Sequence, residues 1–131
     1  MSGMNLATVQ MHMGDLDGAE LQLRRSLSLA EELGNATIAA LCFGLLGTLH
    51  RERGALDQAE SMFRRALQTE IDAANKAGMA TAYSELAETY VAQNRHAQAR
   101  DAYSEALELW KQLGATQLAQ SVKSALSRLS T

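Results

Sequence analysis

Three histidines and a single cysteine are the side chains in this sequence best suited to catalysis. His12, His50 and His96 are far apart along the chain, and none stands in a recognisable Ser-His-Asp or Cys-His context. The sequence also has no glycine-rich loop of the kind that cradles a phosphate group. We therefore expect a protein that is not an enzyme and that needs no cofactor.

Two stretches could instead bind a metal or react through sulfur. Residues 10–13, Gln-Met-His-Met, offer thioether and imidazole groups that suit copper. On a helix, however, neighbouring residues diverge by about 100°, and methionine at such spacing is ordinary core filling, so we expect no metal site. Cys42 has no second cysteine to pair with and lies between Leu41 and Phe43, so we expect a small buried hydrophobe rather than a reactive thiol.

Charge and hydropathy exclude further classes of function. The formal net charge is −3, so the basic surface typical of a nucleic-acid binder is missing and we expect no nucleic-acid partner. No run of eighteen apolar residues could cross a membrane, and residues 1–5 do not resemble a secretory signal, so we expect a soluble, cytoplasmic protein. The pairs Arg24-Arg25 and Arg64-Arg65 should be solvated, and a role in an interface is the alternative.

The elements that must position these side chains are helices. The chain is 47% hydrophobic, has no proline and is only 5% aromatic, which is typical of an all-α protein. Apolar residues at helical spacing, separated by turns of two or three residues, predict seven helices, and turns this short make consecutive helices antiparallel. The third helix is apolar on nearly all sides and should lie between neighbours. The expected helices are Ser2–Met13, Asp15 or Asp17 to Leu33, Ala36–Arg53, Leu56–Ala74, Lys76–Gln93, His96–Leu113 and Ala115–Leu129.

A repeat of forty residues organises these helices. The stretch Arg53–Ala66 has counterparts forty residues earlier, at Met13–Ser26, and forty residues later, at Gln93–Ala106. Each copy has an alanine near the start of a helix, then a large apolar residue, then a small one. Three copies at constant spacing predict an array of one helix-pair unit.

This pattern resembles the tetratricopeptide repeat family. The matching positions are Gly14, Gly54 and Asn94 in the turns, Ala19, Ala59 and Ala99, then Leu23, Phe63 and Tyr103, then Ser26, Ala66 and Ala106. The resemblance implies a right-handed α-solenoid, a single array over residues 1–131. It would comprise repeats at 1–34, 35–74 and 75–114 and a capping helix at 115–131, whose outer face is polar.

The resemblance also implies a concave groove that binds a protein or peptide partner. The groove positions of the family fall on Met4, Asn5, Thr8, Met11, Leu41, Gly44, Leu45, Thr48, Thr81, Ser84, Glu85, Glu88, Ser124, Ala125 and Arg128. They change from apolar near the amino end to acidic in the middle. We therefore expect an amphipathic segment as the ligand, with apolar residues against Leu41 and Leu45 and basic residues near Glu85 and Glu88.

Two features of relatives are missing from these positions. The clamp that holds the tail of heat-shock chaperones needs Lys, Asn and Arg where this sequence has Met4, Thr8, Leu45, Thr81 and Glu85, so such a tail is not the expected ligand. The asparagine ladder of several forty-residue relatives survives only as Asn5, which argues against a long extended peptide.

Two other functions remain open. The methionine-rich first helix could pair with a second copy and form a homodimer. Alternatively, the chain could be a sensory or regulatory segment of a larger protein, as the resemblance to bacterial regulators of this repeat type implies.

Overall fold

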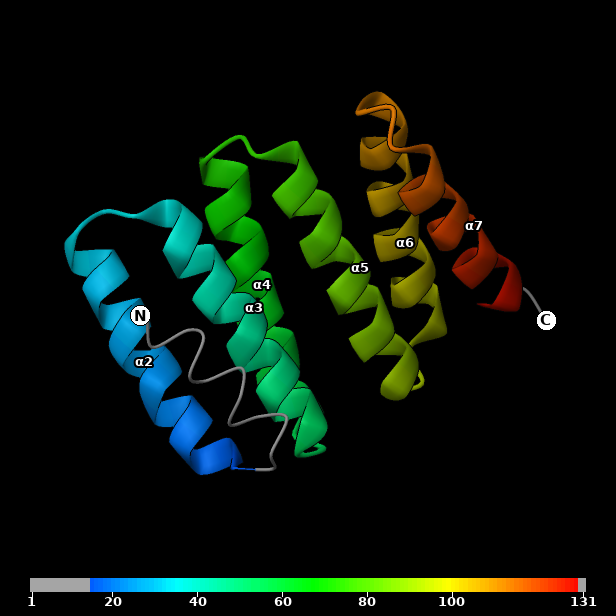
Figure 1. Cartoon of the computed structure of the whole chain (residues 1–131). Coiled ribbons are helices and arrows are strands. Elements are labelled where there is room, and N and C mark those ends of the chain that lie inside the picture. Colours follow the sequence, from blue (N-terminus) through cyan, green and yellow to red (C-terminus); the bar gives the residue numbers. More distant parts are fainter. Residues whose placement is uncertain (1–14, 130–131) are drawn as a thin grey trace. The chain divides into compact units, whose positions relative to one another are not determined.

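The chain is described by a computed structural model that covers residues 15–129. Within this range the structure has six α-helices and no strand (Figure 1). They are α2 (Leu16–Glu32), α3 (Ala36–Glu52), α4 (Leu56–Asp72), α5 (Lys76–Ala92), α6 (His96–Gln112) and α7 (Thr116–Leu129). The all-α prediction is confirmed, with each helix end in this range within two residues of the predicted one. The predicted helix Ser2–Met13 lies outside the described residues. None of the six helices is long and apolar enough to cross a membrane.

The turns between these helices share one construction. The residues with positive φ are Gly34 (66°), Gly54 (77°), Ala74 (53°), Asn94 (60°) and Gly114 (70°). In each turn the following amide donates to the carbonyl five residues earlier, as from Asn35 to Ala30 at 2.8 Å. This Schellman motif satisfies carbonyls at the end of a helix and reverses the chain. The forty-residue repeat therefore consists of two halves of twenty residues with equivalent turns.

Side-chain caps fix where several helices begin. The Asp15 side chain accepts a hydrogen bond from the Gly18 amide at 3.0 Å, as predicted for the start of α2. Asn35 caps α3 in the same way, through the Ile38 amide at 3.1 Å. A cap of this kind pairs an amide that the helix itself leaves without a partner.

The prediction for the end of α4 was wrong. We expected the helix to continue to Ala74, in keeping with the absence of proline after it. The helix ends at Asp72, and Ala74 adopts the left-handed conformation with φ of 53°. Asn75 then caps α5 by accepting a hydrogen bond from the Gly78 amide at 3.2 Å. The N-terminal cap of α5 therefore follows directly after this turn. The sequence gives no signal for the turn itself, because Ala74 is not a residue that favours the left-handed conformation.

The chain forms two compact units, which divide between Thr69 and Glu70 and are described separately. In the first unit, α2 and α3 enclose a core of Ala19, Leu23, Cys42, Leu46 and Leu49, all without exposed surface. A second cluster joins Ala30 of α2 and Phe43 of α3 to Ala66 of α4. The helix α3 therefore packs against both neighbours, as its apolar sequence predicted.

The alternation of small and large residues is confirmed by burial. In the first unit Ala59 and Phe63 of α4 have no exposed surface. The helices α3 and α4 approach closely at Gly47, where an added Cβ would lie 2.6 Å from the Phe63 ring. Small residues permit such approach and large ones fill the space opposite.

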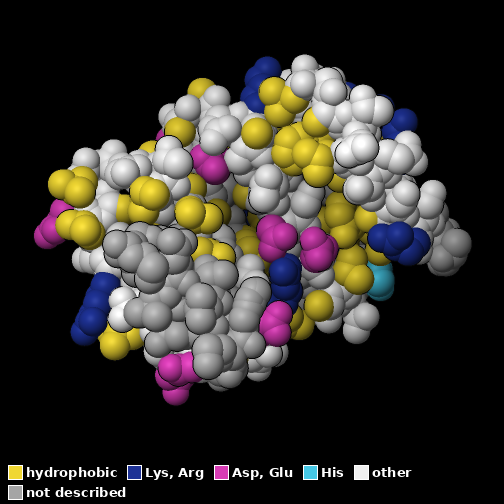
Figure 2. Space-filling model, viewed as in Figure 1, with side chains coloured by type: hydrophobic (Ala, Val, Ile, Leu, Met, Phe, Trp, Pro, Cys, Tyr) yellow, Lys and Arg dark blue, Asp and Glu magenta, His cyan; other side chains and the backbone are white. Residues whose placement is uncertain are grey.

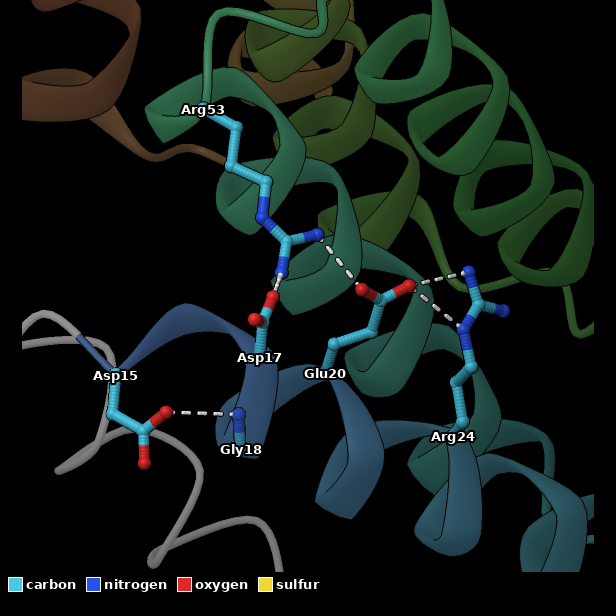
Figure 3. A network of polar contacts seen from close by, with 6 residues as sticks. All are labelled: Asp15, Asp17, Gly18, Glu20, Arg24 and Arg53. Carbon is cyan, nitrogen blue, oxygen red and sulfur yellow. Dashed lines mark hydrogen bonds and ion pairs between the residues drawn. The ribbon is translucent and has the colours of Figure 1, made fainter.

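A network of ion pairs joins the start of α2 to the end of α3 (Figure 3). The Arg53 guanidinium bonds to the Asp17 carboxylate at 2.6 Å and to the Glu20 carboxylate at 2.7 Å. Glu20 also pairs with Arg24, four residues further along α2, at 2.9 Å. The hydrogen bond from Arg53 lowers the pKa of Glu20, and Glu20 in turn raises the pKa of Arg53.

The second unit stacks α5, α6 and α7, with α6 in contact with both others. The predicted repeat residues Ala99, Tyr103 and Ala106 of α6 are all buried. Consecutive antiparallel helices of this kind fit the α-solenoid class that the sequence indicated.

Candidate functional site

A pocket of about 400 Å³ lies in the second unit and is lined by residues of α5, α6 and α7. Its lining residues are Thr81, Ser84, Glu85, Glu88, Tyr103, Trp110, Leu118, Ser121, Val122, Ala125 and Arg128. We call this space the α5–α7 pocket.

The repeat explains why these residues meet. Both α5 and α7 are antiparallel to α6, so they are parallel to each other, and they begin forty residues apart, at Lys76 and Thr116. Residues forty apart therefore lie at similar heights along the pocket. The α5 residues in the lining recur at helical spacings of three and four residues, so they form one stripe.

One end of the pocket is apolar. Trp110 and Val122 are buried, with 8% and 6% of their surface exposed, whereas Leu118 is 49% exposed. The Thr81 hydroxyl donates to the Ala77 carbonyl of its own helix at 3.0 Å, so it is satisfied locally. This end can accept an apolar side chain of a ligand, because such a side chain would remove Leu118 from water.

The other end of the pocket is charged. Glu85 and Glu88 lie on α5, and Arg128 lies on α7. Hydrophobic side chains lie beside acidic and basic ones on the face of the molecule drawn in Figure 2. The combination suits a ligand that carries both apolar and charged groups.

The predicted apolar residues of the first unit form a separate face of α3. Leu41 is 49% exposed, and an added Cβ on Gly44 would meet no atom within 4 Å. Leu45 is half-buried against the core cluster of α2 and α3, and the Thr48 hydroxyl donates to the Gly44 carbonyl at 3.1 Å. Leu41 is the most exposed apolar side chain of this face.

The structure gathers part of the predicted groove. All four α5 positions, together with Ala125 and Arg128, line the α5–α7 pocket, whereas Ser124 does not. Met4, Asn5, Thr8 and Met11 lie outside the described residues. Partner binding by these side chains stays a prediction.

Five lining residues were not predicted as site residues, namely Tyr103, Trp110, Leu118, Ser121 and Val122. The sequence holds a weak signal for two of them. Leu118 and Val122 are four residues apart on the last helix, so they share one face there.

The side chains considered first for chemistry lie elsewhere. Cys42 has no exposed surface, and burial raises the pKa of its thiol. His50 is 8% exposed, and burial lowers its pKa. From Asp15 to Leu129, no group of three His, Cys, Asp or Glu residues could hold a metal ion. The candidate copper ligands at residues 10–13 lie outside this range.

The arginine pairs of the repeat are exposed on the outer helices of the first unit. Arg24 and Arg64 each pair with the glutamate four residues earlier, at 2.9 Å. Arg65 stacks on Phe43, with its guanidinium 4.7 Å from the centre of the ring. The two ion pairs are local, and surface pairs of this kind contribute little to stability.

Comparison with known families now identifies the class of protein. One model described as tetratricopeptide repeat matches residues 1–70, and a second with the same description matches residues 79–113. The chain therefore belongs to the tetratricopeptide repeat family. The resemblance predicted from the repeat residues is confirmed.

Two solved structures are similar to this chain. The crystal structure of BtubC (BKLC) from P. vanneervenii is 27% identical with a TM-score of 0.86, and the match covers 95% of this chain and 51% of that one. This chain thus spans about half the length of that structure. The N-terminal domain of stress-induced protein-1 (STI-1) from C. elegans is 15% identical with a TM-score of 0.74, and the match covers 98% and 92% of the two chains. The second likeness shows the fold alone. No curated protein matches.

Proposed function

We propose that this chain is a non-catalytic protein-interaction module whose α5–α7 pocket binds an amphipathic segment of a partner protein. The observation that carries the proposal is the pocket itself, which joins an apolar end to a charged end over about 400 Å³. Membership of the tetratricopeptide repeat family supports a protein as the ligand.

The proposed segment places an apolar side chain against Trp110, Leu118 and Val122. A lysine or arginine of the same segment lies near Glu85 and Glu88, where charge complementarity favours a cation. Water is excluded at the apolar end, and the charges fix the direction of the segment. The buried area alone would not determine the affinity of so small a site. The charged residues should therefore decide which partner binds.

The exposed face of α3 is a second proposed contact surface. Leu41 and Leu45 both offer apolar surface. Gly44, which lies between them, has no side chain and therefore places no charge there. We assign it to apolar residues of the same partner, and Leu41→Ser tests it separately from the pocket.

A selection from a displayed peptide library tests the pocket. Peptides that bind the chain should be enriched in a lysine or arginine near a large apolar residue. The affinity of a selected peptide, measured by fluorescence polarisation, should fall at least about tenfold for the double variant Glu85→Lys with Glu88→Lys. The matched control is Asp101→Lys with Glu108→Lys, which changes the net charge equally on exposed positions of α6 outside the pocket lining.

The apolar end has its own matched pair of variants. Leu118→Ser removes a side chain that is 49% exposed, and Leu21→Ser removes one that is 52% exposed on α2 of the first unit. Only Leu118→Ser should weaken the peptide. If Leu118→Ser and the α5 double variant both bind like the unaltered chain, the pocket is not the binding site. If Leu118→Ser weakens binding but the α5 double variant binds like the unaltered chain, the electrostatic half of the proposal is wrong.

The absence of catalysis is part of the same proposal. It is supported by the burial of Cys42 and His50 within the helix packing. Homodimer formation through the N-terminal residues, and a regulatory role within a larger protein, are alternatives that the sequence raised. Multi-angle light scattering tests the first, and a reading frame that joins this chain to a further domain would favour the second.

A further inference from the structure

The two sides of the α5–α7 pocket differ in chemistry. On the α5 side every lining residue is polar or acidic, namely Thr81, Ser84, Glu85 and Glu88. On the α7 side the lining changes along the helix, from the apolar Leu118 and Val122 to the basic Arg128. A ligand in this pocket therefore meets an apolar surface and a cation on one side, and carboxylates on the other.

The length and volume of the pocket restrict the conformation of its ligand. Leu118 and Arg128 stand at the two ends of the α7 lining, which are about 15 Å apart at a helical rise of about 1.5 Å per residue. A volume of about 400 Å³ over this length gives a mean cross-section of about 27 Å². A helix with its side chains is about 10 Å wide, so its cross-section is roughly 80 Å². The pocket is therefore too narrow to contain a helix, and an extended segment, whose backbone is only about 5 Å across, fits it better.

The charges on the two sides stand at different distances from the apolar end. Glu85 is level with Ala125, which lies about 10.5 Å beyond Leu118 along α7. Arg128 lies about 4.5 Å further along the same helix. Glu85 is half-buried, so its charge is less screened by solvent than that of the exposed Glu88. Glu85 is therefore the carboxylate best placed to select a cation of the ligand.

The spacing of residues in an extended chain matches these distances. Successive residues advance by about 3.3 Å and point to opposite sides. When one residue points to the α7 side at Leu118, the third residue after it lies about 10 Å further and points to the α5 side, level with Glu85. The fourth residue after it lies about 13 Å further and points back to the α7 side. The Arg128 side chain is long enough to cover the remaining distance of about 2 Å, and its guanidinium offers several donors to a carboxylate.

We infer that the α5–α7 pocket recognises a short extended motif: an apolar residue, two residues of any kind, a lysine or arginine, and then an aspartate or glutamate. The inference rests on the proposed function of the pocket and adds the conformation, spacing and charge order of the ligand. The apolar residue of the motif contacts Trp110, Leu118 and Val122. Its base pairs with Glu85, and its acid pairs with Arg128. The order of the two charges then distinguishes one partner from another.

Two capped peptides of identical composition test the charge order. Both contain a leucine followed by two serines; the ordered peptide continues with lysine and then glutamate, and the exchanged peptide with glutamate and then lysine. The ordered peptide should bind the full chain about fivefold more tightly in fluorescence polarisation, because each of its charges meets an opposite charge. In the double variant Glu85→Lys with Arg128→Glu, the exchanged peptide should instead bind about fivefold more tightly. This variant keeps the net charge of the chain, so long-range attraction cannot cause the reversal.

A second double variant is the matched control. Glu108→Lys with Lys123→Glu exchanges charges at exposed positions of α6 and α7 outside the pocket lining, and it should keep the original preference. A series of ordered peptides with different numbers of serines tests the conformation. Two intervening serines should bind best, whereas an optimum at six would mean a helical ligand and would overturn the inference.

The remaining outcomes separate this inference from the proposed function. The inference is overturned if the ordered and exchanged peptides bind equally, or if the control variant reverses their preference as the first double variant does. The proposed function stands in those cases if peptides selected from the library still lose affinity with Leu118→Ser. If neither these two peptides nor any selected peptide binds in a way that depends on Leu118, the inference and the proposed function both fail.

Discussion

Replacing Ala74 by glycine should make the protein more stable. Ala74 occupies the left-handed position of the turn between α4 and α5, with φ of 53°, where three of the five equivalent turns have glycine. An L-amino acid with a Cβ costs about 1–2 kcal/mol in this conformation. Glycine removes that cost but gains freedom in the unfolded chain, which offsets about 0.4–1 kcal/mol. The expected net gain in the free energy of unfolding is about 0.8 kcal/mol.

Gly54→Ala is the matched control for this prediction. Gly54 has φ of 77°, and an added Cβ would meet no atom within 4 Å, so the effect of this substitution is conformational rather than steric. It should lower the free energy of unfolding by about the same 0.8 kcal/mol. Urea unfolding followed by far-UV circular dichroism measures both variants. If Gly54→Ala destabilises the chain while Ala74→Gly leaves it unchanged or weaker, Ala74 is not strained and the reasoning fails.

Three further predictions concern packing, charge and the thiol. Gly47→Ala should destabilise the chain by about 2 kcal/mol, because the added Cβ would overlap the Phe63 ring of α4. Gly44→Ala should stabilise the chain by about 0.5–1 kcal/mol, because the added Cβ would enter open space. Urea unfolding measures the free energy of unfolding of both variants. Arg53 lowers the pKa of Glu20, so their pair should stabilise the chain above the ordinary pKa of glutamate and be lost as the pH falls through the lowered value; Glu20→Gln should remove about 0.5–1 kcal/mol at neutral pH and flatten this dependence. Cys42, with no exposed surface, should react with a thiol reagent only after urea unfolds the chain.

The helices could be predicted from the sequence because their signals are local. Spacing of apolar residues located the six described helices, and Gly54 and Asn94 were assigned to two of the turns. Ala19 and Leu23 were identified as repeat positions, and both are fully buried. These signals act within a few residues along the chain, so one sequence was sufficient to detect them.

The stop at Ala74 and the full lining of the α5–α7 pocket could not be predicted in this way. Alanine favours helix, so the end of α4 depends on the cap at Asn75 and on the packing of the next helix. Trp110 lies at the carboxyl end of α6, where it helps to line the α5–α7 pocket. That role depends on where α7 lies, which is a tertiary property.

The period of the sequence nevertheless determines which residues lie level with each other along the pocket. Because α5 and α7 are parallel and their starts differ by one repeat, position 85 lies level with position 125, and position 88 with position 128. The first pair is Glu85 and Ala125, and the second is Glu88 and Arg128. Because the two glutamates have different neighbours on α7, Glu85→Lys and Glu88→Lys should weaken a basic partner to different extents, and fluorescence polarisation with a selected peptide measures both. Equal losses would mean that the carboxylates act as one diffuse negative surface rather than as distinct sites.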